Sequence, residues 1–332
     1  MPKSTRNMGK ETMRLILAAM LAALALPCVS AKAEFPLKRP ITIIIGVPAG
    51  GGADAVARLI GPKLTESLGQ PVVVEPRPGA NYLNSVRPVA NAAPDGHTLL
   101  LASSGFSMIA AKPNNPPFDL VRDLAPVSLV ARGHVIMVAS PKLPVNNVPE
   151  FVSLAKKYPG KLAFGSGGTG TLFHLAAEYF KSMTKTDMFH VPYKGSVPAL
   201  QDVMGGHIDF LFDNIGSNIA HVRSGGVKGL AVTSPQRTPS LPDIPTFAEL
   251  GYADFDVSQW YGLFAPPGTP PEIVNRIQAE IAKALAAKEV AERLYNMGNG
   301  GVGTGPAEFT KILQDEHARW NYVIRESGLD LQ

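Results

Sequence analysis

Twice along this sequence, a short apolar run leads into a glycine-rich turn and then into an amphipathic helix. The first instance is the β-branched run at 41–46, which continues as VPAGGG and then carries apolar residues at helical spacing. In the second, residues 161–164 lead into GSGGTG, and a helix is predicted over 171–183. Both places therefore predict a strand, a tight turn and a helix N-terminus.

The same alternation continues around these turns. Further β-rich runs occupy 72–75, 98–102, 188–192, 208–212 and 229–233, and helices are predicted over 83–92, over 149–158 and from 199. Thr269-Pro270-Pro271-Glu272 resembles a capping box before a last helix that carries a stripe of isoleucines. Alternating strands and helices predict a parallel sheet covered by helices, and two such units predict a cleft between them.

The two glycine turns are the first candidates for a binding site. A turn into a helix presents unpaired backbone N–H groups and the positive end of the helix dipole, so its natural ligand is a phosphate or a carboxylate. Gly46 and Gly51 have P-loop spacing, but Gly52 and Ala53 follow in place of lysine and serine or threonine. The sequence therefore argues against a nucleoside triphosphate.

Gly165, Gly167 and Gly170 also match G-x-G-x-x-G, so a dinucleotide is an alternative ligand. An NAD site needs an acid at the end of the following strand, and here the nearest one, Asp187, precedes that strand. The pattern argues against NAD, and we expect no cofactor. The remaining alternative is a glycine loop that only turns the chain.

The first 33 residues have the features of a secretory signal peptide. Basic residues precede an uncharged Ala/Leu-rich stretch at 15–29, and Ala31-Lys32-Ala33 supplies small residues for cleavage before Glu34. A lipid anchor on Cys28 is the alternative. We expect export to the periplasm, and because Cys28 is the only cysteine, the exported chain can form no disulfide or thiolate metal site.

The positive charge of the chain belongs to this same segment. The 332 residues carry a formal net charge of +4, but five of the 31 basic and one of the 27 acidic residues lie in the first 33, leaving 26 of each. A neutral chain lacks the electrostatic footprint of a nucleic-acid-binding protein, and we expect no such partner.

Candidate catalytic residues do not form a recognisable set. Ser166 lacks the G-x-S-x-G elbow because Phe164 stands where the first glycine is needed. The seven histidines contain no H-E-x-x-H, and Asp54, Asp209 and Asp213 are isolated acids. We expect no metal, no catalytic residue and no enzyme activity, with a periplasmic enzyme as an alternative.

Several long segments, in order, resemble the tripartite tricarboxylate transporter substrate-binding proteins, the TctC or Bug family of extracytoplasmic solute receptors. The segments are PLKRPITIIIGVPAGGGADAVAR, LGQPVVVEPRPGA, GSGGTGTLFHLAAEYFK, HVPYKGSVPALQDVMGGHIDFLFDN and GLFAPPGTP, and the resemblance covers 36–329. It implies an α/β, two-domain type II periplasmic binding protein fold. Each domain is then a largely parallel sheet flanked by helices, with the ligand cleft between them.

The resemblance also implies an organisation and a function. The signal peptide takes 1–33, the first domain 34–136 plus 258–332, and the second domain 137–257, with hinge strands at 126–140 and 254–266. A monomeric receptor would capture a small carboxylate, which could be a di- or tricarboxylate, an aromatic acid or an amino acid. It would deliver this ligand to the membrane permease subunits of a tripartite tricarboxylate transporter; a receptor that acts in sensing or signalling is the alternative.

The resemblance places the ligand-binding residues in loops that face the cleft, where backbone amides, hydroxyls and waters hold the carboxylate. The residues at matching positions are Val47, Pro48, Ala49, Gly51, Gly52, Asp54, Ser103, Ser104, Ser166, Gly167, Thr169, Gly170, Thr171, His174, Asp213, Gln259 and Trp260. Among them, His174 is expected to donate a hydrogen bond into the cleft.

Two departures from the family pattern affect this site. Ala53 stands where a hydroxyl residue is common, and NYLNS at 81–85 replaces a glycine-rich segment. Tyr82, in place of a glycine, would reduce the cleft volume or add a stacking wall. Together with Phe106, Phe173 and Trp260, it raises the hypothesis of an aromatic carboxylate ligand.

Overall fold

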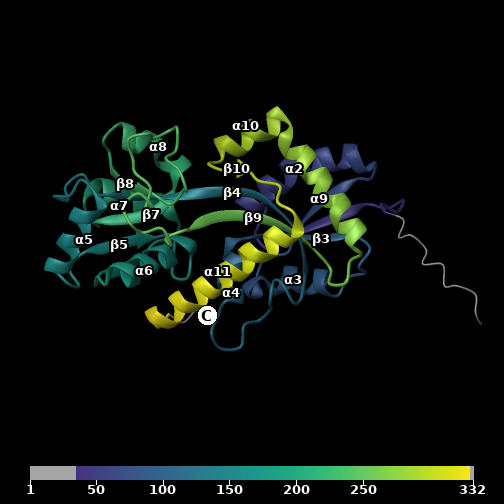
Figure 1. Cartoon of the computed structure of the whole chain (residues 1–332), viewed down its shortest axis with the longest axis horizontal. Helices are drawn as coiled ribbons and strands as arrows, with labels where there is room; N and C mark the ends of the chain where they lie inside the picture. Colours follow the sequence, from purple (N-terminus) through teal and green to yellow (C-terminus); the bar gives the residue numbers. More distant parts are fainter. Residues whose placement is uncertain (1–34, 330–332) are drawn as a thin grey trace, which may run out of the picture. The chain divides into compact units, whose positions relative to one another are not determined.

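The computed structural model describes residues 35–329, and the predicted signal peptide with its cleavage site lies outside them. Strands and helices alternate through most of this part of the chain (Figure 1). None of its helices is both long and apolar enough to cross a membrane.

Within the described residues, the strands form one sheet in the order β2-β1-β3-β9-β4-β7-β5-β6, with β8 and β10 also paired to β4. The strands are β1 (Ile41–Ile45), β2 (Val72–Pro76), β3 (Thr98–Ser103), β4 (Ala125–Ala139), β5 (Ala163–Ser166), β6 (Phe189–Pro192), β7 (Phe210–Asn214), β8 (Lys228–Val232), β9 (Ser258–Ala265) and β10 (Gly300–Gly301). The outer groups β2-β1-β3 and β7-β5-β6 are parallel, which confirms the predicted α/β units.

The two central strands, β4 and β9, connect these groups (Figure 1). The first part of β4 pairs antiparallel with β9, while its last five residues, 135–139, pair antiparallel with β7. β9 in turn pairs antiparallel with β3. β4 and β9 therefore occur where the hinge strands were predicted, at 126–140 and 254–266, within a few residues of those bounds. The division into two domains at 136 and 258 stays a prediction.

The helices cover the sheet. They are α2 (Gly52–Leu68), α3 (Leu83–Ala90), α4 (Ser104–Ala110), α5 (Val148–Lys157), α6 (Leu172–Thr184), α7 (Ser196–Gly205), α8 (Ile215–Arg223), α9 (Pro271–Ala286), α10 (Lys288–Asn296) and α11 (Pro306–Ser327), with a 3₁₀ turn η1 at Ala80–Tyr82. α2, α3, α5, α6, α7 and α9 match predicted helices.

The predicted capping box before α9 is wrong. The residue at the N-cap is Pro270, and no side chain accepts a hydrogen bond from the first turn. The hydroxyl of Thr269 instead donates to the carbonyl oxygen of Pro266 at 2.7 Å. Proline at the first helical position fixes the start of α9 without a side-chain cap, because that position has no N–H to satisfy.

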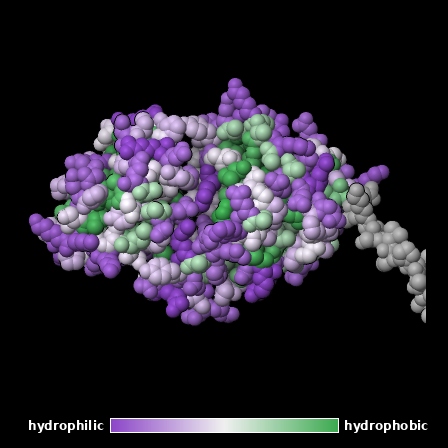
Figure 2. All heavy atoms as spheres, in the orientation of Figure 1, coloured by the Kyte–Doolittle hydropathy of each residue, from purple (hydrophilic) through white to green (hydrophobic). Residues whose placement is uncertain are grey.

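α11 links the apolar cores of the two halves. Its first turns place Phe309 and Leu313 in a cluster with β3 and β9 residues, while Trp320, Val323 and Ile324 belong to a cluster formed mainly by 135–257. The C-terminal half of this helix therefore packs against the half of the chain that was predicted to be the second domain. The face drawn in Figure 2 is mostly hydrophilic, with groups of hydrophobic residues among the hydrophilic ones.

The contact between β9 and α11 gives a stability prediction. A methyl group at Gly262 would collide with the buried ring of Phe309, so Gly262→Ala should lower the free energy of unfolding by about 1–3 kcal/mol. Gly61→Ala is the control, because a methyl group there meets only Val72 at 3.7 Å inside α2. It should be neutral or stabilising. Urea denaturation compares the two; equal stability would contradict the packing described.

Candidate functional site

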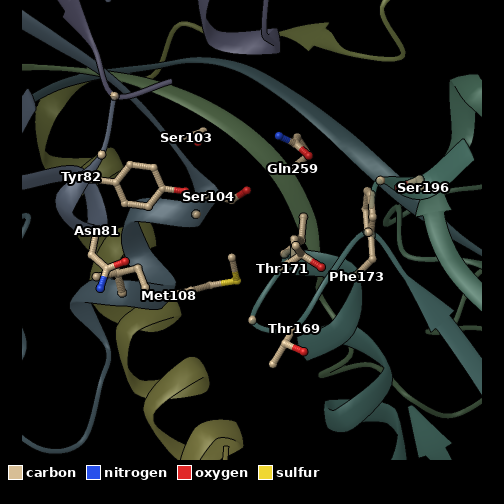
Figure 3. A pocket seen from close by; sticks show the side chains of 18 residues that line it. Asn81, Tyr82, Ser103, Ser104, Met108, Thr169, Thr171, Phe173, Ser196 and Gln259 are labelled. Atoms are coloured by element: carbon tan, nitrogen blue, oxygen red, sulfur yellow. The ribbon is translucent and has the colours of Figure 1, made fainter. Parts of the chain in front are cut away.

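A cavity of about 860 Å³ is lined by residues from both parallel groups (Figure 3). Its lining residues are Gly46, Gly79, Asn81, Tyr82, Ser103, Ser104, Gly105, Met108, Ile109, Gly167, Thr169, Gly170, Thr171, Leu172, Phe173, Gly195, Ser196 and Gln259. None of these side chains is charged, so a ligand would meet backbone dipoles, hydroxyls and apolar surface. A volume of this size is typical of a small-molecule site.

The N-terminus of α6 faces this cavity and is left uncapped. Thr171 is the N-cap residue, but its hydroxyl donates to the carbonyl oxygen of Gly168 at 2.8 Å and accepts nothing from the first turn. The first two helical residues, Leu172 and Phe173, line the cavity. Among the hydrogen bonds of the described residues, none uses their N–H groups. Unpaired donors at a helix N-terminus attract an anion.

Two further helices begin at the same cavity. Ser103 and Ser104 stand at the start of α4, and Gly195 and Ser196 at the start of α7; neither helix has a side-chain cap. The hydroxyls of Ser103 and Ser104 make no hydrogen bond within 35–329, although both residues are buried. The cavity therefore collects uncapped helix ends and free hydroxyl groups.

The glycine loop before α6 is held by two stacked histidines. The N–H of Gly170 donates to Nδ1 of His174 at 2.9 Å, and Nε2 of His190 lies 2.7 Å from the hydroxyl of Ser166. The rings of His174 and His190 are parallel, with centroids 3.8 Å apart. Burial lowers the pKa of His174 to about 3 and that of His190 to about 4, so both rings are neutral at pH 7.

This geometry changes the role expected for His174. Its side chain is only 2% exposed, and its ring accepts a hydrogen bond from the glycine loop. The sequence had predicted instead that the ring would donate a hydrogen bond into the cleft. Ser166 is equally buried, and its hydroxyl also accepts from the N–H of Gly168. Both residues support the loop, and neither lines the cavity.

The loop after β1 contributes less to the cavity than predicted. Only Gly46 lines it, while Val47, Pro48, Ala49, Gly51 and Gly52 lie outside and Pro48 and Ala49 are exposed. Asp54 folds back on this loop and accepts from the N–H of Gly50 at 3.0 Å and from Arg58 at 2.9 Å. The hydrogen bond from Arg58 holds the pKa of Asp54 below its usual range, so Asp54 fixes the loop as an anion.

Two other predicted residues point into the protein. Trp260 is fully buried, and its indole N–H donates to the carboxyl group of Glu316 at 2.7 Å. Asp213 is 3% exposed and accepts from the N–H of Asn214 and the side chain of Asn218. Burial raises the pKa of Asp213, and these donors oppose that shift. Alternation along β9, where Gln259 lines the cavity, turns Trp260 to the other face of the strand. Asp213 does not line the cavity, although the hydroxyl of Ser196, a lining residue, also lowers its pKa.

Seven predicted residues do line the cavity: Ser103, Ser104, Gly167, Thr169, Gly170, Thr171 and Gln259. Sequence reasoning missed the N-terminus of α7 and the apolar residues Met108, Ile109 and Leu172. The glycine before Ser196, at positive φ, resembles the other glycine turns and could have marked α7 as a third helix N-terminus.

The described residues show no complete catalytic set. Ser166 and His190 lie within hydrogen-bonding distance, but no acid holds the second nitrogen of His190 and Ser166 is buried in its loop. No group of three or more His, Cys, Asp or Glu side chains in 35–329 could hold a metal ion.

Two solved structures share this fold. MatC from Rhodopseudomonas palustris, with bound malate, is 32% identical with a TM-score of 0.70 over 87% of this chain and 100% of that one. Rpa4515 from R. palustris, with adipate, is 31% identical with a TM-score of 0.69 over 89% of this chain and 99% of that one. Fold and cavity together define a solute-binding receptor of the periplasmic binding protein type, as the sequence predicted.

The family follows from two sequence comparisons. The family model described as tripartite tricarboxylate transporter family receptor, TctC, matches residues 56–329. The protein BugT of Bordetella pertussis is 37% identical over 296 residues, which are 89% of this chain and 91% of BugT. The chain belongs to the TctC family of receptors.

The buried histidine of the loop gives a pH prediction. Because the folded-state pKa of His174 is about 3 and an unfolded histidine titrates near 6.5, its neutral form stabilises the fold fully above pH 6.5. This contribution falls by about 1.4 kcal/mol per pH unit as the pH drops from 6 towards 4. His174→Asn keeps an acceptor for Gly170 without the titration.

The free energy of unfolding of the wild type, relative to that of His174→Asn, should therefore fall steadily as the pH is lowered from 6.5 to 4. Urea denaturation at several pH values measures it. Parallel pH profiles for the two proteins would mean that His174 is not buried as a neutral acceptor.

Proposed function

We propose that this chain is a periplasmic receptor that captures a small carboxylate in the cavity and delivers it to a tripartite tricarboxylate-type membrane permease. The observation that carries the proposal is the uncapped N-terminus of α6. Its first two residues, Leu172 and Phe173, have unpaired N–H groups and line a cavity that contains several hydroxyls and no charged side chain. Amide donors and a helix dipole select an anion.

A carboxylate fits this arrangement better than a phosphate group does. A dianionic phosphate is commonly matched by lysine or arginine, and the cavity lining contains neither. A carboxylate carries one charge over two oxygens, which the N-terminus of α6 and the hydroxyl of Thr169 could satisfy together. The relatives with bound malate and adipate support the same ligand class.

The predicted residues of the loop 47–52 fit a ligand-bound state of this receptor. This loop follows β1, is exposed at residues 48–50 and 52, and lies outside the cavity lining. Bending of β4 and β9, the two strands shared between the parallel groups, would bring the loop to the ligand. Export through the segment 1–33 would place the receptor in the periplasm, and binding without turnover would make it a receptor and not an enzyme.

The first test removes one donor from the polar side of the cavity. The hydroxyl of Thr169 makes no hydrogen bond within 35–329, so it is free for a ligand. Thr169→Val should weaken carboxylate binding by about 1–3 kcal/mol, because a hydrogen bond to a charged group is lost. Isothermal titration after unfolding and refolding, which removes co-purified ligand, measures the change.

Thr310→Val is the matched control. Thr310 lies on α11, its hydroxyl donates to the carbonyl oxygen of Pro306, and it does not line the cavity. It should leave affinity unchanged. A panel of di- and tricarboxylates, aromatic acids and amino acids, with NAD as a negative ligand, identifies the solute by melting temperature. Stabilisation by NAD alone would overturn the proposal.

A further inference from the structure

An unusual backbone segment carries Tyr82 into the cavity. Ala80, Asn81 and Tyr82 have φ values of 49°, 47° and 69°, so three consecutive residues with side chains adopt the left-handed conformation. Such a run is unfavourable for any residue but glycine and persists only where surrounding contacts enforce it. Here Asn84 donates to the carbonyl oxygen of Pro78 and Ser85 to that of Tyr82, which holds the turn.

The ring of Tyr82 is held flat against a fully buried ring. Its centroid lies 3.9 Å from that of Phe106, at an interplanar angle of 18°. Gly46 and Gly105 leave room for it: a methyl group at Gly46 would lie 3.0 Å from Cδ1 of Tyr82, and one at Gly105 would lie 2.5 Å from its hydroxyl oxygen. Tyr82 is therefore a preorganised aromatic surface in the cavity wall.

The hydroxyl of Tyr82 points into the cavity near Ser104 (Figure 3). It makes no hydrogen bond to any residue within 35–329. Burial raises the pKa of this phenol, so it stays a neutral donor at physiological pH. The ring's edge and hydroxyl are consequently available to a bound molecule.

The N-terminus of α6 lies across the cavity from Tyr82. Tyr82 and Met108 lie on one side together with Ser104, and the turn with Thr169 and Thr171 lies on the other side with Phe173 (Figure 3). A ligand with its carboxylate at α6 would direct the rest of its skeleton towards Tyr82. A flat, apolar skeleton fits that surface, because aromatic rings gain from stacked or edge contacts.

We propose that Tyr82 makes this receptor selective for aromatic carboxylates, with the ligand's ring against Tyr82 and its carboxylate at the N-terminus of α6. This inference rests on the proposed carboxylate receptor function and names the solute class within it. The rigid turn matters because a surface fixed before binding costs no ordering when the ligand arrives.

The experiment compares two ligands that differ in the ring alone. Benzoate and cyclohexanecarboxylate have the same charged group and similar size, but only benzoate is planar and aromatic. Isothermal titration of the refolded protein should give tighter binding of benzoate by about 2- to 12-fold, the range of an aromatic pair. Equal affinities for the two acids in the wild type would overturn the inference.

Three variants locate the preference. Tyr82→Phe retains the ring and should keep the ratio of the two affinities, whereas Tyr82→Leu retains bulk without an aromatic face and should reduce the ratio to about one. Tyr82→Gly should also reduce the ratio to about one, and it removes the energetic cost of a positive φ at this position. Because the phenylalanine and leucine variants both fill the site, circular dichroism is expected to show them folded. An unchanged ratio in Tyr82→Leu would contradict the role of the ring.

Failure of the inference is distinguishable from failure of the proposed function. Thr169→Val should weaken both acids by the same factor, because it acts on the carboxylate end. If neither these acids nor any other carboxylate binds the wild type, both the receptor function and the inference are overturned. A different result would overturn only the inference about Tyr82. In that case adipate binds tightly, Thr169→Val weakens adipate binding, and the protein binds benzoate no more tightly than cyclohexanecarboxylate.

Discussion

The pairing of β4 is the constraint on which the rest of the structure depends. One fifteen-residue strand hydrogen-bonds to β9 along its first part and to β7 and β8 along its last residues, so the two parallel groups share a continuous backbone. Because the groups share these strands, only certain strand ends can meet at one cavity. The turns that lead from those strand ends to the following helices therefore line it. α11 adds a second connection, because its ends belong to different apolar clusters.

Around that frame, the site uses backbone more than side-chain charge. Three helices, α4, α6 and α7, begin at the cavity without side-chain caps, and buried neutral histidines hold the loop before α6 in shape. In the proposed receptor, such a site would bind the carboxylate group and contact little of the remainder of the ligand. Selectivity would then depend on the surface opposite α6, where Tyr82 lies in a left-handed turn that sequence preferences do not predict.

Local patterns predicted much of the fold. The short apolar runs and glycine turns identified β1, β5 and the helices after them, because periodicity and turn chemistry act over a few residues. The capping box failed because the helix begins one residue later than the motif requires: Pro270, which has no side-chain acceptor, stands at the N-cap. α11 was not predicted, and its packing on both clusters depends on contacts between residues up to about 200 positions apart, such as Ser107 with Glu316.

The site was predicted only in part, because local patterns identify turns but not the packing of side chains from distant parts of the chain. Glycine turns before helices mark backbone donors, so Gly167, Thr169 and Gly170 were correctly placed at the cavity lining. The burial of a side chain on a strand depends on packing against distant parts of the chain, and Trp260 and Asp213 are buried although the resemblance implied positions that face the cleft. Tyr82 stood out only as a departure from a glycine-rich segment; its left-handed turn and its stacking on Phe106 needed the structure.

The central claim is that the N-terminus of α6 holds a carboxylate, and amide resonances test it most directly. In ¹⁵N-labelled, refolded protein titrated with the carboxylate that most raises the melting temperature, the amides of Gly170, Leu172 and Phe173 should shift together with one dissociation constant. If that carboxylate binds while these three resonances stay fixed and others move, the carboxylate lies elsewhere and the account is contradicted.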